Sequence, residues 1–556
     1  MKGTQPEPPV SFSDRSNAAM LGLALGDAFG RPLEFLRGHA VRTRPVDTSP
    51  GVFMWTDDTH MSIYLAEAVL AQGPDRLVDD AFGEAVGEAF SRWLDDPLTP
   101  STAPGSTCTA GARNWRRTRD WRTSGVAASD GCGAVMRIGP IAIAFAGEEL
   151  DRAARISALV THGHENAVHA AIALARLVRS LLEGHPLNAE RVEAALVGLP
   201  EAGDTARALR AGVRFASTQA DQLDESAIPA GDGGWRSPSA VGLALAAALR
   251  WHDDVGLAIE RAARIDGDSD SVAAITGLIL GAARGTTSLP APWVRALPER
   301  ERLEQLATAL AVRGQPWLVV ADLHGRLAPL EAAIRRVEAV PHMRLCLLGD
   351  YVDNGPEIPA LLDRILALKA AWGARLVTLA GNHDVTCTQA LDAVGGPNEA
   401  YWAMRWPSHW NDGASTPDVY RAGTIPNLAR KMPAAHRAFL RDLPWTHDTG
   451  RYLFVHAGMQ SGPLGPQISM LAGRETGPEM YPEDGKNRGQ PPHLRGKTLK
   501  QTEDPAWDRV VVTGHSRHIP SPCWEGRNRL ALHATDRPQA PVYAVELPAR
   551  GIVKAL

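Results

Sequence analysis

The chain has 556 residues, more than one hydrophobic core usually holds, so two or more domains are expected. Apolar residues make up 44% of it and charged residues 22%, which is the composition of an ordinary globular protein. The formal net charge of −5 argues against a protein that coats nucleic acids, because general coating needs a cationic surface. A small basic pocket for one anionic ligand remains compatible with this charge.

The cysteines and the apolar runs indicate the compartment. The five cysteines stand far apart and form no Cys-x-x-Cys pair, which favours free thiols in a reducing environment. Residues 1–15 are polar and rich in proline, so we expect a flexible tail rather than a secretory signal. The longest apolar run, about 240–249, is too short to span a bilayer. We therefore expect a cytoplasmic protein that does not act at a membrane.

Residues 16–285 are predicted to form an all-α domain. Alanine-rich stretches repeat apolar residues every three or four positions, which is typical of amphipathic helices. One of these stretches is followed by Gly184 and Pro186, a usual helix stop. The predicted helices are Met61–Leu70, Asn166–Glu183, Ser239–Arg250 and Ser271–Ala283.

A linker and a second domain follow. Residues 286–314 contain three prolines and then a short charged helix at about 299–312, so they are predicted to connect two domains. In residues 315–556, short apolar strands alternate with helices, which is an α/β pattern with a buried sheet. The predicted strands are Trp317–Ala321, Arg344–Leu348, Leu376–Leu379, Tyr452–Val455 and Val510–Thr513. Residues 395–445 are expected to form a lid insertion, and 462–502 a long surface excursion.

Acidic residues gather at the starts of two predicted helices in the first half. The first cluster is Trp55–Thr59 (WTDDT) and the second is Gly267–Ser271 (GDSDS). A single aspartate at a helix start usually caps free N–H groups and complements the helix dipole. Adjacent carboxylates repel each other unless a cation neutralises them. Carboxylate and hydroxyl oxygens suit Mg²⁺ or Mn²⁺, so the two clusters predict a divalent-metal site.

Six motifs in the first half resemble the ADP-ribosylglycohydrolase family. In chain order they are LGLALGDAFGRPLEF, WTDDTHMS, APGSTCTAG, SDGCGAVMRIGPIAI, THGHENA and DGDSDSVAAITGLILG. The resemblance implies an all-α globule that hydrolyses an ADP-ribosyl glycosidic bond with two Mg²⁺ ions. One ion would take Thr56, Asp57, Asp58 and Asp270, and the other would take Asp268, Asp270 and Ser271. The ions would hold the ribose hydroxyls beside the anomeric carbon and position a water.

The same resemblance implies the substrate side of this site. Glu34 is expected to be a catalytic residue in contact with substrate or metal. The ADP-ribose cleft would be lined by Gly131, Gly133, Arg137 and His162. A core or capping role explains His162 almost as well. Some relatives carry an aspartate before a Gly-x-Thr element, where this chain has Ala103–Pro104, so the catalytic base must be another residue or a metal-bound hydroxide.

In the second half, potential metal ligands follow the predicted strands. In chain order they are Asp322, His324, Asp350, Asp353, Asn382, His383, Asp384, His456 and His515. Sites in open α/β sheets form at the carboxyl ends of strands, so we expect these side chains to converge. Oxygen and imidazole ligands suit manganese, iron or zinc. Two such ions could clamp a phosphoryl group and activate a water between them.

This pattern resembles the calcineurin-like metallophosphoesterases, in particular the branch of Ser/Thr protein phosphatases and symmetrical dinucleoside tetraphosphatases. The resemblance implies a β-sandwich flanked by helices with two Mn²⁺ or other divalent transition-metal ions. One ion would take Asp322, His324 and Asp350, and the other would take Asp350, Asn382, His456 and His515. His383 would protonate the leaving oxygen, and Asp353 would orient that histidine.

One position departs from the phosphoesterase pattern. The element GDYVDNG places Asn354 where an arginine usually binds the phosphate, and a neutral amide cannot make the charge-assisted fork of a guanidinium. Arg405 or Arg421 in the expected lid could supply the missing charge. A nucleotide or another small phosphoester is therefore favoured over a phosphoprotein as the substrate.

Two function hypotheses follow from the fusion of two hydrolase-like halves. In the first, both act in one ADP-ribose or nucleotide-processing pathway, on an ADP-ribosylated protein, nucleic acid or small molecule and on a phosphoester. In the second, the first half only binds ADP-ribose and brings an active phosphatase to its target. The missing acid before Gly105 favours the second hypothesis, and the complete set of aspartates favours the first. A purely structural role fits poorly with two full sets of metal ligands.

Overall fold

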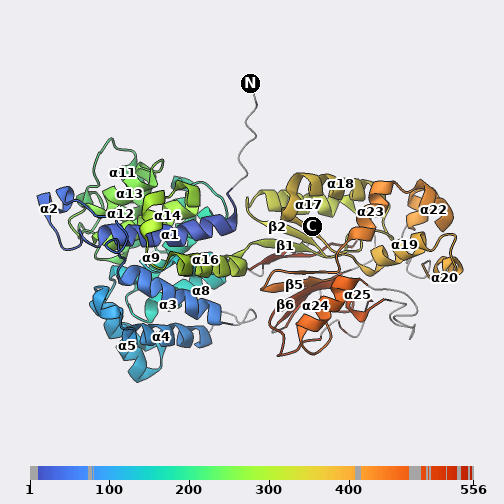
Figure 1. Ribbon diagram of the computed structural model, residues 1–556, viewed down its shortest axis with the longest axis horizontal. Coiled ribbons are helices and arrows are strands. Elements are labelled where there is room, and N and C mark those ends of the chain that lie inside the picture. Colours follow the sequence, from blue (N-terminus) through green and yellow to red (C-terminus); the bar gives the residue numbers. More distant parts are fainter. Residues whose placement is uncertain are drawn as a thin grey trace. The chain divides into compact units, whose positions relative to one another are not determined.

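The computed structural model describes residues 10–72, 78, 80–406, 415–474, 490–495, 499, 502–520, 522–526, 528–534, 540–548 and 551–553. The chain divides into two compact units, Met1–Gln315 and Pro316–Leu556. The first unit is helical and the second is built on β-sheets, so the predicted fold classes are confirmed (Figure 1). Among the described residues, no helix is both long and apolar enough to cross a membrane.

The described residues of the first unit include the sixteen α-helices α1 to α16. Their bounds are α1 Phe12–Gly30, α2 Gly38–Thr43, α3 Asp57–Ala71, α4 Asp80–Asp95, α5 Ser106–Thr118, α6 Trp121–Ser124, α7 Gly139–Ala144, α8 Gly147–Leu159, α9 Glu165–Leu182, α10 Ala189–Leu196, α11 Asp204–Ala216, α12 Ser237–Arg250, α13 Val255–Ala263, α14 Ser269–Arg284, α15 Ala291–Ala296 and α16 Arg300–Gly314. Helices α3, α9, α12 and α14 match the four predicted from apolar periodicity.

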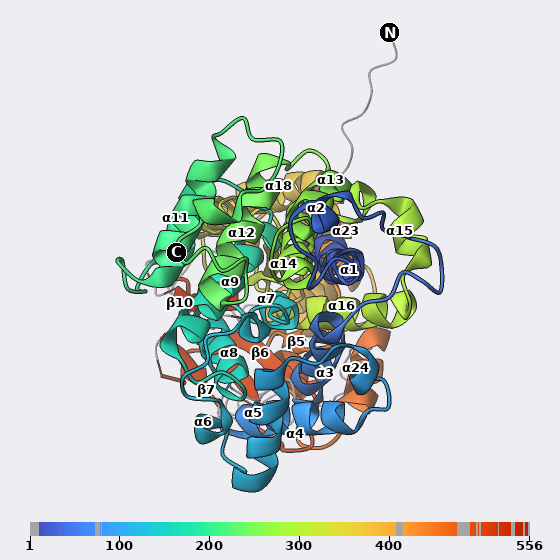
Figure 2. The same ribbon diagram turned by 90° about the vertical axis from the view of Figure 1, so that its left-hand side faces the viewer.

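Helices α1 and α14 pack backbone to backbone in the centre of this unit (Figures 1 and 2). A Cβ atom on Gly22 would lie 2.2 Å from the carbonyl oxygen of Gly277, and one on Gly26 would lie 2.0 Å from that of Ala273. Only glycine permits such an approach. Gly30, at the end of α1, equally leaves no room for a side chain beside Asp270. This packing brings the end of α1 against the acidic start of α14.

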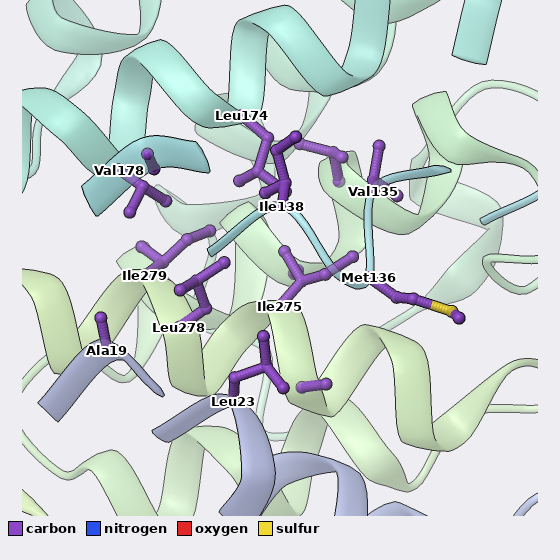
Figure 3. Packing of buried hydrophobic residues seen from close by; sticks show 14 of the residues in the cluster. Ala19, Leu23, Val135, Met136, Ile138, Leu174, Val178, Ile275, Leu278 and Ile279 are labelled. Atoms are coloured by element: carbon purple, nitrogen blue, oxygen red, sulfur yellow. The ribbon is translucent and has the colours of Figure 1, made fainter. Parts of the chain in front are cut away.

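The core of the first unit surrounds this helix pair. Figure 3 shows Ala19 and Leu23 of α1 and Ile275, Leu278 and Ile279 of α14 beside the loop residues Val135, Met136 and Ile138 and beside Leu174 and Val178 of α9. All ten are at most 3% exposed. The loop after Gly131 is therefore anchored in the same core that fixes the two helices, which places it near the acidic helix starts.

The segment expected to be a linker contains the short helix expected in it, α16. Its helix α16 packs against α1, α3 and α7, and Leu303, Ala307 and Leu310 are buried in the core of the first unit. The apolar face of α16 was too narrow to distinguish it from a solvent-exposed charged helix in the sequence. Residues 291–314 are thus part of the first compact unit rather than a free connection.

In the part of the second unit that the structure describes, the strands form two five-stranded sheets. One has the strand order β10-β9-β1-β2-β3 and the other β4-β5-β6-β8-β7. The strand bounds are β1 Trp317–Val320, β2 Arg344–Leu347, β3 Leu376–Thr378, β4 Thr446–Asp448, β5 Tyr452–Val455, β6 Val510–Ser516, β7 Cys523–Glu525, β8 Arg529–His533, β9 Ala544–Leu547 and β10 Gly551–Val553. Strands β1, β2 and β3 are parallel, as are β5, β6 and β8.

The two sheets face each other across a shared apolar layer. Trp317 and Val319 of β1, Phe454 of β5 and Val512 of β6 belong to one buried cluster, so the sheets form a sandwich. A second buried cluster contains apolar residues of the strands and of the helices that pack against the sheets. These helices are α17 Leu327–Glu338, α18 Ile358–Trp372, α19 Asn382–Asp392, α20 Glu399–Arg405, α21 Thr416–Val419, α22 Ile425–Lys431, α23 Ala434–Asp442, α24 Leu464–Gly473 and α25 Pro492–Arg495.

Two candidate active sites

The first candidate site joins the starts of α3 and α14. The hydroxyl oxygen of Thr56 lies 3.3 Å from Asp270 Oδ2, and the hydroxyl of Ser271 donates to Asp58 Oδ1 at 3.3 Å. The six residues predicted as metal ligands are all at most 6% exposed, namely Thr56, Asp57, Asp58, Asp268, Asp270 and Ser271. Two helix starts more than 200 residues apart in sequence thus form one buried acidic cluster.

This cluster is electrostatically unfavourable without a cation. Burial and the neighbouring carboxylates raise the pKa of Asp57 to about 8 and the pKa values of Asp58 and Asp268 well above the usual range. Within the described part of the chain, Oδ2 of Asp58 and Oδ2 of Asp268 are buried without a hydrogen-bond donor. Buried carboxylate oxygens without donors are what a divalent metal ion requires. The residues present therefore fit the predicted Mg²⁺ ions.

A pocket of about 230 Å³ opens over these carboxylates. It is lined by Glu34, Asp57, Asp58, Ala103, Gly105, Ser106, Thr107, Cys108, Gly131, Cys132, Gly133, Met136, His162, Trp235, Asp268, Asp270 and Ser271. Glu34 is half-buried at this pocket, and burial followed by the charges of Asp270 and Asp268 raises its pKa to about 10. The structure brings Glu34, the glycine loop and His162 together with the acidic cluster at this pocket.

Arg137 takes a different position from the predicted one. It is fully buried, is not among the pocket-lining residues, and its guanidinium donates to the carbonyl oxygens of Gly133 and Ser157 and to the Thr161 hydroxyl. Arg137 therefore supports the loop from beneath. A guanidinium usually remains exposed unless buried acceptors bind it, and these acceptors are carbonyls that no motif reveals.

His162 combines the two alternatives that the sequence left open. Its ring lines the pocket, yet the residue is only 1% exposed and Nδ1 lies 2.7 Å from the Thr161 hydroxyl oxygen. Burial, followed by the charge of Arg137, lowers the pKa of His162 to about 3. The imidazole is therefore neutral at physiological pH and can only offer or accept a hydrogen bond at the pocket wall.

Asp27 is a site residue that the sequence reasoning did not assign. Its Oδ1 accepts hydrogen bonds from the backbone N–H and the hydroxyl of Thr56, both at 2.8 Å. Its Oδ2 accepts from the backbone N–H and the hydroxyl of Thr59, at 2.9 and 2.6 Å. The carboxylate of α1 thus caps α3 from a neighbouring helix and orients the hydroxyl of a predicted metal ligand.

The second candidate site lies where the strands of the sandwich end. Oδ2 of Asp350 lies 3.7 Å from His324 Nε2 and 3.3 Å from His456 Nε2. His456 Nε2 also lies 3.1 Å from Asn382 Oδ1 and 3.2 Å from His515 Nδ1. The remaining predicted ligand, Asp322, accepts from the backbone N–H of His515 at 3.1 Å. The structure therefore brings together all six predicted ligands.

Among the described residues, Asp350 belongs to two groups in which three His or Asp ligand atoms lie within 4.8 Å of one another. One group is His324, Asp350 and His383, and the other is Asp350, His456 and His515. A carboxylate common to two groups fits a bridge between two ions. The first group contains His383, which was predicted as the proton donor. A metal ligand and a proton donor thus lie equally close to Asp350.

The charges of this site support metal binding. Burial alone would raise the pKa of Asp350, but the imidazoles of His456, His383 and His324 hold that pKa well below its usual range. Burial would lower the pKa of His456, but Asp350 and Asp322 raise it to about 9. His456 must therefore lose this proton before its ring can bind a metal ion. Five site residues adopt left-handed backbone conformations, which are strained outside glycine and concentrate at functional sites; these are His324, Asp350, Asp353, Asn354 and His515.

The predicted histidine–aspartate pair is present beside the ligands. His383 Nδ1 donates to Asp353 Oδ2 at 2.9 Å, and Asp353 is fully buried. Burial would lower the pKa of His383, but Asp350 and Asp353 raise it. The Asp353 carboxylate keeps a proton on Nδ1 of His383. When the ring is charged, its second proton is on Nε2, which is the proton it can give away.

A residue that the sequence analysis does not single out places a positive charge near the second site. Asn354 is buried, Arg421 is exposed, and the guanidinium of Arg405 lies over the Tyr401 ring at 5.8 Å. Arg495, which ends α25, lies close enough for its charge to act on both His383 and His515. It opposes the carboxylates that raise the pKa of His383, and it adds to the burial and the His456 charge that lower the pKa of His515. No motif in the sequence singles it out; only the fold brings α25 to the metal ligands.

These two sites can be compared with known proteins. Residues 8–318 match the family model "ADP-ribosylglycohydrolase", and residues 316–539 match "Calcineurin-like phosphoesterase". An uncharacterized protein of Archaeoglobus fulgidus is 33% identical over 311 residues, covering 54% of this chain and 96% of that protein. The ADP-ribosylarginine hydrolase Tri1 of Serratia proteamaculans is 30% identical, covering 54% of this chain and 80% of that protein.

Relatives of the second unit match over shorter stretches. The serine/threonine-protein phosphatase 6 catalytic subunit of Drosophila melanogaster is 38% identical over 69 residues, covering 12% of this chain and 23% of that protein. The first unit is thus a glycohydrolase domain and the second a phosphoesterase domain, so both are hydrolases of metal-dependent families. The chain belongs to the ADP-ribosylglycohydrolase family and carries a calcineurin-like metallophosphoesterase domain after it.

Proposed function

We propose that the first unit hydrolyses an ADP-ribosyl glycosidic bond with two Mg²⁺ ions. The observation that carries the proposal is the buried cluster of Asp57, Asp58, Asp268 and Asp270 at the floor of the pocket. When bound, the ions would fix the ribose hydroxyls and lower the pKa of a water. Glu34 stands at the same pocket and contacts the substrate or the attacking water.

The first unit's own residues shape this substrate site. The Gly131–Gly133 loop packs tightly against other residues of the pocket wall, because a Cβ on Gly133 would lie 2.5 Å from Cys108 Sγ and 2.9 Å from the His162 ring. Arg137 holds this loop from below, and Asp27 holds the hydroxyl of Thr56 toward the cluster. These contacts support an ADP-ribose cleft with little freedom to move, as catalysis by orientation requires.

We further propose that the second unit hydrolyses a phosphoester. Asp322, His324, Asp350, Asn382, His456 and His515 would hold two Mn²⁺ or other divalent transition-metal ions. When bound, the ions would polarise the phosphoryl group and supply an activated water. His383 would give a proton to the leaving oxygen, and Asp353 keeps its ring oriented. The proximity of Arg495, together with the neutral Asn354, supports a nucleotide or another small phosphoester as substrate.

The fusion supports a single ADP-ribose or nucleotide-processing pathway for the two reactions. The substrate of the first unit would be an ADP-ribosylated protein, nucleic acid or small molecule. The alternative is an ADP-ribose-binding module that directs an active phosphatase. The absence of an acid in the stretch Thr102–Thr107, whose Gly105 N–H donates to Asp57 Oδ2 at 2.9 Å, favours this alternative.

The two functions can be separated in one experiment. The full chain is incubated with Mg²⁺ and Mn²⁺ and a panel of ADP-ribosylated arginine, serine and nucleic acid and ADP-ribose 1″-phosphate, beside Asp270→Ala and Asp350→Ala variants. Release of ADP-ribose that is lost only in Asp270→Ala supports the glycohydrolase and identifies the bond it cleaves. No release from any compound, with phosphate still liberated in an Asp350-dependent reaction, supports the binding module.

A further inference from the structure

The carboxylate of Asp353 accepts hydrogen bonds from other side chains as well as from His383. Its Oδ2 accepts from His383 Nδ1 and from the indole N–H of Trp406, both at 2.9 Å. Its Oδ1 accepts from the Thr416 hydroxyl, and its backbone N–H donates to the same hydroxyl oxygen at 3.1 Å. Asp353, Trp406 and Thr416 are all 0% exposed. This buried carboxylate therefore has three side-chain donors.

Two of these donors come from the segment predicted as a lid insertion. Trp406 directly follows α20 and Thr416 opens α21, whereas Asp353 follows β2 and His383 lies in α19. Trp406 is buried in the same apolar cluster as Trp402, so the ring is anchored independently of its hydrogen bond. Two residues of the insertion thus make direct hydrogen bonds to Asp353, the carboxylate of the histidine–aspartate pair.

We propose that Trp406 and Thr416 are positioning residues that keep the proton of His383 aimed at the leaving oxygen. The inference rests on the proposed phosphoesterase function. Asp353 has a φ of 62°, a strained conformation that must be held by its surroundings. Donors on both oxygens fix the plane of the carboxylate, and that plane fixes the imidazole. Neither positioning residue is required to touch the substrate.

The step that they serve is the hydrolysis of a phosphomonoester. The water oxygen bonds to phosphorus while the bond between phosphorus and the leaving oxygen breaks. The leaving oxygen takes the proton of His383 and departs as an alcohol, and a proton of the attacking water restores His383. A leaving oxygen of high basicity depends strongly on this proton, whereas nitrophenolate departs with little help.

The test compares good and poor leaving groups in the full metal-loaded chain. Trp406→Phe keeps the ring and removes the N–H, and Thr416→Val keeps the shape and removes the hydroxyl. We expect each variant to lower kcat on phenyl and alkyl phosphates about 10-fold or more, with at most about 3-fold loss on p-nitrophenyl phosphate and little change in KM. Equal losses on all esters, or none, would overturn the proposal.

Matched controls separate positioning from folding. Trp402→Phe removes a neighbouring buried indole of the same cluster that makes no hydrogen bond to Asp353 within the described residues, so it should leave the leaving-group dependence unchanged. Thr416→Ser retains the hydroxyl and should restore the wild-type pattern. A variant that loses metal or unfolds would instead lose activity on every ester.

A second readout does not depend on turnover. The indole N–H proton signal that disappears in Trp406→Phe identifies Trp406, and this signal should move upfield in Asp353→Asn because a charge-assisted hydrogen bond is lost. An unmoved signal would contradict the proposed contact. If the wild-type chain hydrolyses no phosphate ester, the phosphoesterase proposal fails, while the indole signal still decides whether Trp406 holds Asp353.

Discussion

Ser271 and Asp58 are 213 residues apart in the sequence, yet the Ser271 hydroxyl donates to Asp58 Oδ1 at 3.3 Å. The contact exists because Gly22 and Gly26 of α1 let α14 approach to backbone distance and because Asp27 of α1 also holds the start of α3. Helix α1, through its glycines and Asp27, thus brings the starts of α3 and α14 together in the acidic site. The site depends on helix packing as much as on its ligands.

The metal-free protein should lose stability as the pH rises from about 4 to about 8. The folded-state pKa of Asp57 is raised to about 8 by burial, whereas an unfolded aspartate has a pKa of about 3.9. The stability that the protonated carboxyl contributes is complete below the unfolded pKa and is lost as the pH rises through the folded pKa. Thermal unfolding in EDTA at pH 5 and pH 8 measures this loss.

Asp57→Asn provides the control for that measurement. Without a charge at this position, the metal-free variant should unfold at a higher temperature than the wild type at pH 8, and the difference should shrink at pH 5. Mg²⁺ should stabilise the wild type and have much less effect on the variant. A variant that shows the wild-type pH dependence and the wild-type response to Mg²⁺ would exclude Asp57 from the metal site.

Asp27→Asn should weaken metal binding although Asp27 is not a predicted ligand. An amide can accept from Thr56 on one side, but its NH₂ group would face the N–H and hydroxyl of Thr59. Loss of a buried charge-assisted hydrogen bond costs about 1–3 kcal/mol, and loss of a residue that orients a ligand typically costs 10–100-fold in metal affinity. Calorimetric titration with Mg²⁺ and a thermal unfolding curve measure the two effects. Thr59→Val, which removes only the hydroxyl contact to Asp27 Oδ2 and keeps the backbone one, should affect stability more than affinity.

The sequence predicted what depends on local pattern. The strands that end in Asp322, Asp350, Asn382, His456 and His515 are short apolar runs followed by a ligand, and each lies where it was expected. The first-half helices with an apolar stripe were found as well. Helix α1 was missed because small and apolar residues surround it on nearly every side, which leaves no stripe to detect.

The sequence could not predict contacts that depend on tertiary packing. Strands β4, β7 and β10 have three residues each, too few for an alternating pattern, and unlike the equally short β3 they do not lead into a motif of candidate ligands. Asp27, Arg495 and Trp406 lie near the reacting groups only because other elements bring their helices there. The motif predicts Arg137 at the pocket, whereas its burial beneath the loop also depends on the Ser157 carbonyl and the Thr161 hydroxyl, which lie outside that motif.

Binding of the metal ion at His456 should release a proton. The pKa of His456 is raised to about 9 by Asp350 and Asp322 against the effect of burial, so the metal-free imidazole is charged at pH 7.5. A metal ligand must be neutral imidazole, so the apparent affinity for Mn²⁺ should rise with pH and level off above about pH 9. Calorimetric titration in two buffers with different ionisation enthalpies should reveal about one proton released. Identical heats in both buffers would contradict this assignment.

Arg495→Met should raise the KM for a phosphoester without removing the metal ions. The charge of Arg495 acts on His383 and His515, which places the guanidinium beside the proposed position of the phosphoryl group. A charged hydrogen bond to phosphate contributes about 1.5–3 kcal/mol, which corresponds to an increase in KM of roughly 10–100-fold. Arg421→Met, at an exposed position of the expected lid, is the matched control and should leave KM unchanged. If Arg421→Met raised KM while Arg495→Met did not, the phosphate-binding charge would belong to the lid, and the neutral Asn354 would be compensated from there.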